Sequence, residues 1–294
     1  MTEPITVFTP TFNRAFCLGQ LYQSLVRQTD QHFLWLIIDD GSTDNTKTLV
    51  ESWINENRIA IKYVFQQNQG MHSGHNTAYS MIDTELNVCI DSDDYMPDDA
   101  IDKILKRWSS GRNEKYAGII GLDAFTDGSI VGTPIPEDLR TATLSEIYDM
   151  HHVTGDKKLV LRTDVVREFP QYPIYPEERL VPLGTLYKMI DRKYTYLCSN
   201  DVYCIVEYLS DGSSNNILKQ YRKSPKGFIY ARLAELQHSK GPMHAFSRAM
   251  HLISSALFAG KPDIFTNNSQ KFITVLAIPF GLMLHCYILI KTRK

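Results

Sequence analysis

The stretch LNVCIDSDD, residues 86–94, joins an apolar run to an acidic turn, and the rest of the fold can be worked out from it. The first five residues have the composition of a short buried strand. The last four include the carboxylates of Asp91, Asp93 and Asp94. Carboxylates this close repel one another, so their clustering favours a bound cation. Hard oxygen ligands of this kind suit Mg²⁺ or Mn²⁺, which often share their coordination shell with substrate phosphates. The alternative is an acidic turn that only caps a helix starting at Pro97.

Similar apolar runs recur through the first 120 residues, and stretches with helical spacing separate them. The predicted strands are Ile5–Thr9, Phe33–Asp39, Ala60–Phe65, Leu86–Asp91 and Tyr116–Gly121. The predicted helices follow Asn13, cover Asn45–Glu56 and about His72–Ile82, and begin at Pro97. Alternation of this kind predicts an α/β fold, with a mostly parallel sheet and helices on both faces. Ligands of such sheets bind at the carboxyl ends of the strands, here just after Thr9, Asp39 and Ile90.

The pattern loosens after about residue 122. Short strands are predicted at Lys158–Arg162, Tyr194–Cys198 and Val202–Tyr208, with a helix at Arg179–Ile190. From about Ser224 the sequence is helical in character. We therefore expect a C-terminal helical extension of the sheet.

The tail is unusually apolar. Phe272–Ile290 contains no formally charged residue and precedes Lys291, Arg293 and Lys294. Its length is close to that of a membrane-spanning helix, although Pro279 and Gly281 weaken that interpretation. Peripheral attachment to a membrane, spanning and plain core packing all stay open. A basic stretch precedes the tail and suits anionic lipid headgroups or a substrate diphosphate, or else a solvated helix face. It consists of Lys219, Arg222, Lys223, Lys226, Arg232 and Lys240, opposed only by Glu235.

Composition excludes several classes of protein. The chain has 294 residues, 43% hydrophobic and 22% charged, which is globular rather than disordered or fibrous. Its 31 Lys+Arg against 33 Asp+Glu lack the basic excess of a nucleic-acid binder. The five cysteines form no CxxC pair, which disfavours a disulfide framework or a structural zinc site and favours a reducing compartment. The N-terminus does not look like a secretion signal.

Four segments together resemble the family 2 glycosyltransferases, whose fold is the A-type (GT-A) nucleotide-sugar-binding fold. They are ITVFTPTFNR (5–14), LIIDDGSTDNT (36–46), QNQGMHSGHNTAY (67–79) and CIDSDDYMPDDA (89–100), and they occur in the expected order. The resemblance implies a nucleotide-sugar-binding half in residues 1–121 and an acceptor-binding half in residues 122–223. Residues 224–294 would then form the helical extension, on or near a membrane.

The resemblance also assigns roles to individual residues. Asp40 would contact the base of the donor, in a pocket lined by Thr9, Pro10 and Thr11. Asn76 and His75 would lie near the ribose and phosphates, and Asp91 near the ribose or sugar. Asp93 would bind the metal, Mn²⁺ or Mg²⁺, with Asp94 in support. His72 and His75 could also be interpreted as a zinc pair, but no third ligand follows them closely.

The family needs a general base in the second half of the chain. The segment YPEERLVP (175–182) is similar to the segment that carries it in a bacterial polysaccharide-synthesis branch, which places Glu178 at the acidic position. Glu177 replaces the usual glycine, so the assignment can slip by one residue. Both acids can instead simply favour a helix N-terminus. The loop Tyr208–Asn216 resembles one that closes near the acceptor or the diphosphate.

The resemblance thus implies an inverting, metal-dependent glycosyltransferase of the hexosyl or N-acetylhexosaminyl class. It would move sugar from a nucleoside-diphosphate donor, UDP being expected, to a saccharide acceptor. Capsule, O-antigen or exopolysaccharide assembly on a lipid-linked acceptor is the expected setting, at the cytoplasmic face of the plasma membrane. Two alternatives remain: a nucleotidyltransferase of similar fold, or a non-catalytic glycan-binding or scaffold subunit.

Overall fold

The computed structural model describes residues 4–207, 217–237, 239, 241–260 and 263–293. The chain divides into two compact units, which are described separately. The first contains Met1–Gln171 and Ile190–Leu209, and the second contains Tyr172–Met189 and Ser210–Lys294. The division at residues 121 and 223 concerns donor and acceptor binding rather than compactness, and it stays a prediction.

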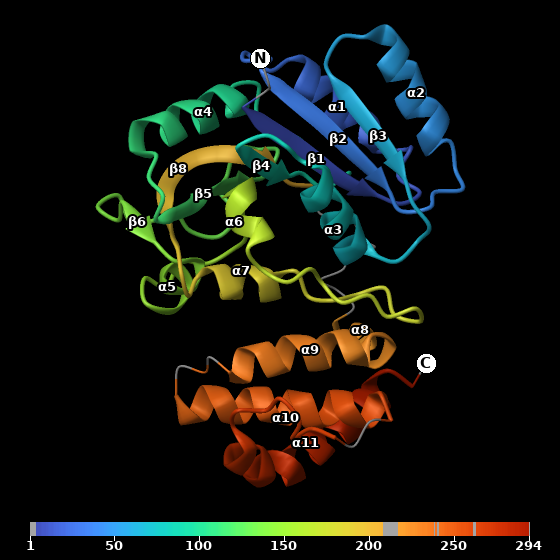
Figure 1. The fold of residues 1–294 in the computed structure, drawn as a ribbon, viewed down its shortest axis with the longest axis vertical. Coiled ribbons are helices and arrows are strands. Elements are labelled where there is room, and N and C mark those ends of the chain that lie inside the picture. The colour runs from blue at the N-terminus through green and yellow to red at the C-terminus, as the bar shows by residue number, and fades with distance from the viewer. Residues whose placement is uncertain (1–3, 208–216, 238, 240, 261–262, 294) are drawn as a thin grey trace. The chain divides into compact units, whose positions relative to one another are not determined.

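The described part of the first unit is built on one eight-stranded sheet, in the order β3-β2-β1-β4-β7-β5-β8-β6 (Figure 1). The strands are β1 (Ile5–Thr11), β2 (Phe33–Asp39), β3 (Ile61–Phe65), β4 (Leu86–Cys89), β5 (Tyr116–Ala124), β6 (Thr141–Ala142), β7 (Lys157–Arg162) and β8 (Thr195–Ile205). β1 pairs in parallel with β2 and β4, and β5 with β8, whereas β7 runs antiparallel to both of its neighbours. The predicted mostly parallel α/β sheet is confirmed.

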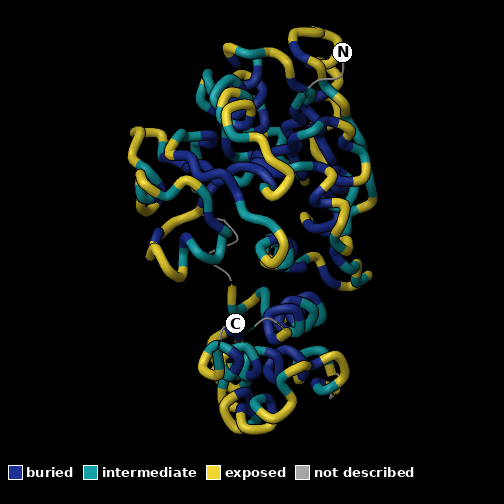
Figure 2. Tube along the Cα trace, turned by 60° about the vertical axis from the view of Figure 1, so that its left-hand side comes forward, coloured by how far each residue is buried: buried dark blue, intermediate teal, exposed yellow. Residues whose placement is uncertain are grey.

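Helices cover both faces of this sheet because the side chains of β1 alternate between two apolar layers. Ile5 and Val7 belong to a core cluster that includes residues of α1 and α4. Phe8 points to the other face, where its ring contacts Tyr79 of α3 edge-on at 5.4 Å. The strands β1, β2 and β5 are accordingly buried along nearly their whole length, whereas the edge strand β3 is partly exposed. Exposed residues gather in loops and on outer helix faces (Figure 2). The helices of this unit are α1 (Leu18–Val26), α2 (Thr46–Glu56), α3 (Met71–Met81), α4 (Ala100–Gly111), α5 (Leu144–Asp149) and α6 (Thr163–Arg167).

Several predicted ends are shifted by a few residues, and α4 begins at Ala100 rather than at Pro97. Two elements differ more strongly. The expected strand pair Tyr194–Cys198 and Val202–Tyr208 is one strand, β8, which ends at Ile205; Tyr208 lies outside the described residues. The prediction left residues 199–201 outside both strands, but Asn200 is held in β8 because its side-chain amide exchanges hydrogen bonds with the backbone of Ile135. The expected helix Arg179–Ile190 is shorter, with α7 covering Gly184–Ile190. Pro182 disfavours helical backbone at the residue before it, which explains the late start.

The second unit contains the expected C-terminal helices. They are α8 (Ile217–Lys223), α9 (Pro225–Leu236), α10 (Pro242–Phe258) and α11 (Lys271–Lys291), and α7 contributes to the same unit. α10 and α11 enclose an apolar cluster that includes Leu252, Ile253 and Ala277. By length and composition, α11 is long and apolar enough to cross a membrane. An 18-residue stretch of it has a mean hydropathy of 2.2, and 22% of that stretch is buried.

A buried carboxylate organises the polar contacts of this unit. Glu235, 9% exposed, accepts a hydrogen bond from Arg232 at 2.7 Å and lies 3.3 Å from Arg248. Lys188 donates to its other oxygen. Burial alone would raise the pKa of Glu235, but Arg232 and Lys188 outweigh it and lower the pKa to about 2. The charge is therefore an integral part of the helix packing.

This depressed pKa predicts acid sensitivity of the second unit. A carboxylate whose pKa is lower in the folded than in the unfolded state stabilises the fold at any pH above its unfolded-state pKa. This stabilisation is lost as the pH falls from the unfolded-state pKa to the folded-state pKa. For Glu235 the loss falls between pH 4.5 and about 2, and Glu235→Gln should remove ~3 kcal/mol at pH 7. Urea unfolding followed by circular dichroism at pH 7 and pH 3 measures both. The exposed Glu177→Gln is the control; equal pH dependence in wild type and Glu235→Gln would contradict the prediction.

Candidate functional site

The carboxyl ends of β1, β2 and β4 meet at one edge of the first unit (Figure 1). Thr11 is in register with Asp39, and the backbone N–H of Asp40 donates to the carbonyl of Thr11 at 2.8 Å. β4 runs beside β1 on its other side and leads directly into Asp91. The structure therefore brings the predicted residues of three separate motifs to the same edge, because parallel strands end on the same side of a sheet.

The end of β1 forms one wall of the site. The indole N–H of Trp35 donates to the hydroxyl of Thr9 at 3.0 Å, so this hydroxyl already has a structural partner. Thr11 is buried, and within the described residues its hydroxyl has no hydrogen-bond partner. Pro10 packs on Gly74 of α3, where an added Cβ would lie 3.1 Å from the Pro10 Cβ. Glycine thus lets α3 approach the strand end closely.

Asp40 fixes the turn that leads into α3. Its buried carboxylate accepts hydrogen bonds from the backbone N–H groups of Gln69 at 3.0 Å and Gly70 at 2.7 Å. The side-chain amide of Gln66 adds a third at 2.8 Å. Its predicted contact with the donor base therefore concerns a carboxylate that also positions α3.

α3 presents its two predicted donor-binding residues differently. His75 is 1% exposed, and its ring packs edge-on against Phe8 at 5.0 Å. Its Nδ1 lies 3.2 Å from the Tyr79 hydroxyl and its Nε2 3.7 Å from the Cys89 thiol. Burial lowers the pKa of His75 to about 3, so the ring is neutral at physiological pH. Asn76 is half-buried on the same helix.

The acidic turn is attached to the end of β8. Tyr95 forms an antiparallel bridge with Ile205, and Asp94 accepts a hydrogen bond from the backbone N–H of Glu207 at 3.2 Å. Asp93 is half-buried, and its carboxylate makes no hydrogen bond or ion pair with any described residue. Asp94 therefore supports the turn, whereas the carboxylate of Asp93 is available to a ligand.

Lys158 and Asp123, which we did not predict from the sequence, complete this edge. The Lys158 ammonium lies 3.7 Å from the Asp123 carboxylate, and both side chains are largely buried. Burial alone would lower the pKa of Lys158, but Asp123, Asp91 and Asp94 outweigh it and raise the pKa well above its usual value. Burial raises the pKa of Asp94 to about 7 and also raises the pKa values of Asp91 and Asp123.

Lys158 reaches the site because β7 runs backwards. Residues at the amino end of an antiparallel strand lie beside the carboxyl ends of its parallel neighbours, and Lys158 pairs with Gly121 near the end of β5. Asp123 follows the apolar run of β5, so the strand-end rule was sufficient to nominate it. The direction of β7 has no signal in the sequence.

The acidic turn can supply only part of the ligand shell of a divalent cation. Within the described chain, no three His, Cys, Asp or Glu side chains lie together as a metal-binding group. The available Asp93 carboxylate, beside an edge with more buried carboxylates than cations, fits an ion that takes few protein ligands. Mg²⁺ and Mn²⁺ behave in this way when phosphates and water complete the shell.

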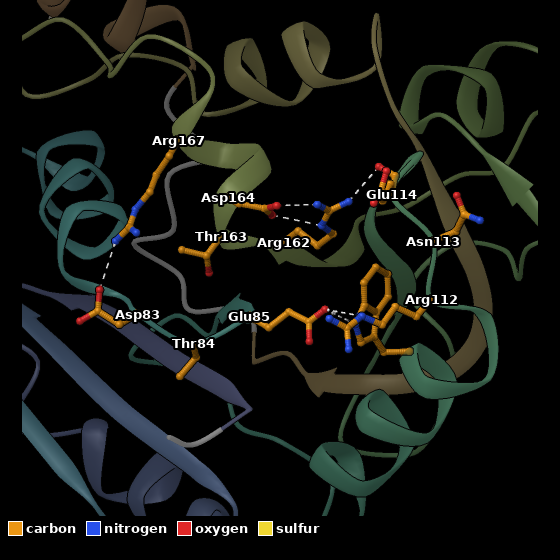
Figure 3. Close-up of a pocket in the computed structure, with 11 residues that line it drawn as sticks. Asp83, Thr84, Glu85, Arg112, Asn113, Glu114, Arg162, Thr163, Asp164 and Arg167 are labelled. Atoms are coloured by element: carbon orange, nitrogen blue, oxygen red, sulfur yellow. Dashed lines mark hydrogen bonds and ion pairs between the residues drawn. The ribbon is translucent and has the colours of Figure 1, made fainter. Parts of the chain in front are cut away.

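A larger cavity, about 880 Å³ in volume, lies at the opposite edge of the sheet. Figure 3 shows three arginines around it, each already engaged with a carboxylate. Arg112 lies 3.0 Å from Glu85, while Arg162 and Arg167 pair with Asp164 and Asp83. Neutralised cations at the amino ends of β4 and β5 do not form a ready diphosphate site. Size alone therefore does not locate the functional edge.

Glu178 belongs to the second unit. Its buried carboxylate accepts hydrogen bonds from the backbone N–H groups of Lys226 at 3.0 Å and Gly227 at 2.9 Å. These N–H groups belong to the first turn of α9, which has no carbonyl partner for them. Glu178 thus caps a helix as the alternative interpretation described, while Glu177 is exposed. The predicted loop Tyr208–Asn216 lies outside the described residues.

Comparison with known proteins identifies the domain that carries the strand-end site. Residues 6–130 match the model of Glycosyl transferase family 2. This part of the chain is therefore similar to the family 2 glycosyltransferases. The match contains β1 to β5 and all of the predicted donor and metal residues. The family resemblance predicted from the four motifs is thereby confirmed.

Curated relatives match part of the chain. Validoxylamine A glucosyltransferase of Streptomyces hygroscopicus is 44% identical over 68 residues, 22% of this chain and 16% of that protein. The GalNAc(5)-diNAcBac-PP-undecaprenol beta-1,3-glucosyltransferase of Campylobacter jejuni is 29% identical over 119 residues, 40% and 37% of the two chains. The chain thus aligns with less than half the length of these relatives.

Solved structures match over nearly the whole chain. TarS residues 1–349 from S. aureus, in complex with UDP-GlcNAc, give a TM-score of 0.60 at 17% identity, covering 95% of this chain and 80% of that one. The mannosyltransferase PcManGT of Pyrobaculum calidifontis, in complex with GDP-Man and Mn²⁺, gives 0.56 at 16% identity, covering 97% and 85%. The GT-A fold predicted from the sequence is confirmed.

The coupling between Lys158 and Asp123 gives a measurable prediction. Lys158→Met leaves buried carboxylates without their counter-charge and should cost ~3–5 kcal/mol of unfolding free energy. The double variant Lys158→Met/Asp123→Asn should cost at least ~1 kcal/mol less than the sum of the single changes. Urea unfolding followed by tryptophan fluorescence reports on this unit, which contains Trp35, Trp53 and Trp108.

The control for this cycle combines Lys158→Met with Asp102→Asn. Asp102 lies on α4, and its carboxylate forms an ion pair with the exposed Lys106. That pair should be additive. Additivity in the Asp123 cycle as well would show that the two side chains do not stabilise one another.

Proposed function

We propose that this chain is an inverting glycosyltransferase that moves a sugar from a nucleoside-diphosphate sugar to a saccharide hydroxyl. The observation that carries the proposal is the acidic turn: the Asp93 carboxylate has no partner among the described residues, at the strand edge of a family 2 domain. UDP is the expected nucleotide, and a hexosyl or N-acetylhexosaminyl group the expected cargo. The TarS and PcManGT complexes, with UDP-GlcNAc and with GDP-Man, support nucleotide sugars as the donor class.

Donor binding is proposed at the carboxyl edge of β1, β2 and β4. Thr9, Pro10 and Thr11 line the base pocket, and the Thr11 hydroxyl, which has no partner among the described residues, offers a hydrogen bond there. Asp40 contacts the base while it holds the start of α3. Burial of these groups before the ligand arrives reduces the cost of ordering them on binding.

The phosphates and the sugar lie toward α3 and the acidic turn in this proposal. Asn76 is the residue of α3 that reaches them, with His75 fixing the helix from behind, and Asp91 contacts the ribose or sugar.

Asp93, with Asp94 bracing the turn, is proposed to hold Mn²⁺ or Mg²⁺. Such an ion, when bound, supplies positive charge to the diphosphate as it leaves. The complex of PcManGT with Mn²⁺ supports divalent metal use. Lys158 limits the repulsion among Asp91, Asp94 and Asp123, so the edge keeps its shape between turnovers.

Proton transfer is assigned to Glu178, which would accept the proton of the acceptor hydroxyl as its oxygen attacks the anomeric carbon. General-base assistance of this kind contributes about 10²–10⁴-fold. The carboxylate also accepts two backbone hydrogen bonds, so its catalytic role would use the remaining lone pairs. Glu177, the exposed neighbour, is the alternative base in the same segment.

The acceptor is proposed to be a growing, lipid-linked saccharide of capsule or O-antigen type, reached at the cytoplasmic face of the plasma membrane. The Campylobacter jejuni relative is named for its action on an undecaprenol-linked saccharide, which supports this class. The apolar, largely exposed α11 supports peripheral attachment.

Donor binding tests the proposal directly. Wild-type protein should bind UDP or another nucleoside diphosphate more tightly with Mn²⁺ than without it, and should slowly hydrolyse one nucleotide sugar of a panel. Asp93→Asn should lower the Mn²⁺-dependent affinity at least ~10-fold, because it removes the available carboxylate. Isothermal titration calorimetry measures these affinities for the wild type and for Asp93→Asn. Asp102→Asn is the matched control, and pyrophosphate release from a nucleoside triphosphate would favour the nucleotidyltransferase instead.

The base assignment has its own test. Glu178→Gln should leave donor affinity within about threefold and slow transfer at least ~10²-fold. Because Glu178 also caps α9, each variant needs a thermal unfolding curve beside its rate. Glu177→Gln, made in parallel, should be nearly silent; if it alone is crippled, the base is Glu177 and Glu178 is structural.

A further inference from the structure

A small cavity opens between α8 and the C-terminal end of α11. It has a volume of about 370 Å³ and is lined by Arg222, Cys286, Leu289, Ile290 and Arg293. All five residues belong to the second unit. The lining therefore combines two guanidinium groups with an apolar wall.

The two arginines are placed differently but are both available to a ligand. The guanidinium of Arg222 donates to the carbonyl of Thr292 at 3.2 Å, which ties α8 to the end of α11. Arg293, which directly follows Thr292 in the chain, is exposed. Neither guanidinium forms an ion pair with a carboxylate of the described chain. Arginines that line one cavity without a carboxylate partner are groups that proteins use to bind phosphate.

The apolar wall continues along α11. One stripe of α11 packs on α10: Gly281 lies so close to Ile253 that an added Cβ would be 2.6 Å from the Ile253 Cβ. The other sides of the helix carry large apolar residues that face outward. They are Phe272, Val275, Leu276, Phe280, Leu282, Met283, Tyr287 and Ile290, each at least 44% exposed. An alkyl or prenyl chain leaving the cavity would meet this surface next.

The charge of the chain is strongly divided. Residues 210–294 contain 12 of the 31 Lys and Arg but only three of the 33 Asp and Glu. The preceding residues are accordingly acidic, although the whole chain has a net charge of only −2. A basic unit with an exposed apolar helix complements an anionic lipid rather than a neutral one.

We infer that this cavity binds the phosphate head of a lipid, with Arg222 and Arg293 on the phosphate and the hydrocarbon chain along Leu289 and Ile290. The inference deepens the proposed membrane attachment, on which it rests, by naming a site and a ligand class. The phosphate has two possible sources, an anionic phospholipid of the bilayer or the polyprenyl phosphate that carries a saccharide.

Vesicle binding by the full-length protein tests this site without any donor or turnover. The probes are phosphatidylcholine vesicles containing phosphatidylglycerol or polyprenyl phosphate at matched total charge. Arg222→Gln/Arg293→Gln should weaken binding to one or both at least ~10-fold more than the control Lys219→Gln/Lys271→Gln. The control removes the same charge from α8 and from the opposite end of α11, outside the cavity.

Each outcome has a defined meaning. A selective loss on polyprenyl phosphate supports the carrier lipid as the source, and a selective loss on phosphatidylglycerol supports the bilayer. Equal losses of vesicle binding in the cavity and control variants would show that binding depends on the positive charge of the unit and not on this cavity. That result would overturn the proposed site. Retained donor binding by the same samples separates that failure from failure of the proposed enzyme.

Two further variants guard against loss of structure. Arg293→Gln alone leaves the Arg222–Thr292 contact intact and should still lose ~3-fold or more relative to Lys271→Gln. Cys286→Trp fills the cavity while keeping both arginines, and should weaken binding to the preferred vesicles. Unchanged binding by both variants would also overturn the proposal.

Discussion

The need to neutralise buried carboxylates governs the strand edge of this protein. Asp91, Asp94 and Asp123 lie where parallel strands end, and burial raises their pKa values. Lys158 supplies the counter-charge from the reversed strand β7. Without that cation, three acids in a poorly solvated place would repel one another at a cost that packing alone does not offset. Binding chemistry at this edge therefore depends on a residue outside the recognisable motifs.

The remaining polar groups at the edge are mostly committed to internal contacts. Asp40 holds the entry to α3, the Thr9 hydroxyl holds Trp35, and Asp94 holds the end of β8. Asp93 and Thr11 differ, because neither side chain has a hydrogen-bond partner among the described residues. An edge whose surroundings are fixed and which keeps an available carboxylate at Asp93 is suited to a polar ligand, because little order has to be imposed on binding.

The second unit has a different physical character. It contains most of the unbalanced positive charge and an apolar helix that is largely exposed. Its buried carboxylate Glu235 is surrounded by Arg232, Arg248 and Lys188. Internal neutralisation of this kind leaves the outer cations, such as Arg222 and Arg293, to interact with something else. Together with the apolar surface of α11, this makes an anionic lipid the consistent partner.

Sequence periodicity was sufficient for the parallel core, the helices around it and the edge at which β1, β2 and β4 end, because strand and helix periods are local properties. The four motifs were sufficient for the family. Local patterns were less reliable where side chains have distant partners: Asn200 was left outside the predicted strands but is bound to Ile135 within β8.

Only the tertiary structure decided that β7 runs antiparallel and delivers Lys158 to the acidic edge. It also decided that Glu178 binds the N–H groups of α9, and that Arg222 meets the end of α11. Strand direction and contacts between distant segments depend on how the whole chain packs, and no short stretch of residues encodes them. The sequence thus determined which chemical groups follow each strand, while packing determined which of them are neutralised, capped or left available.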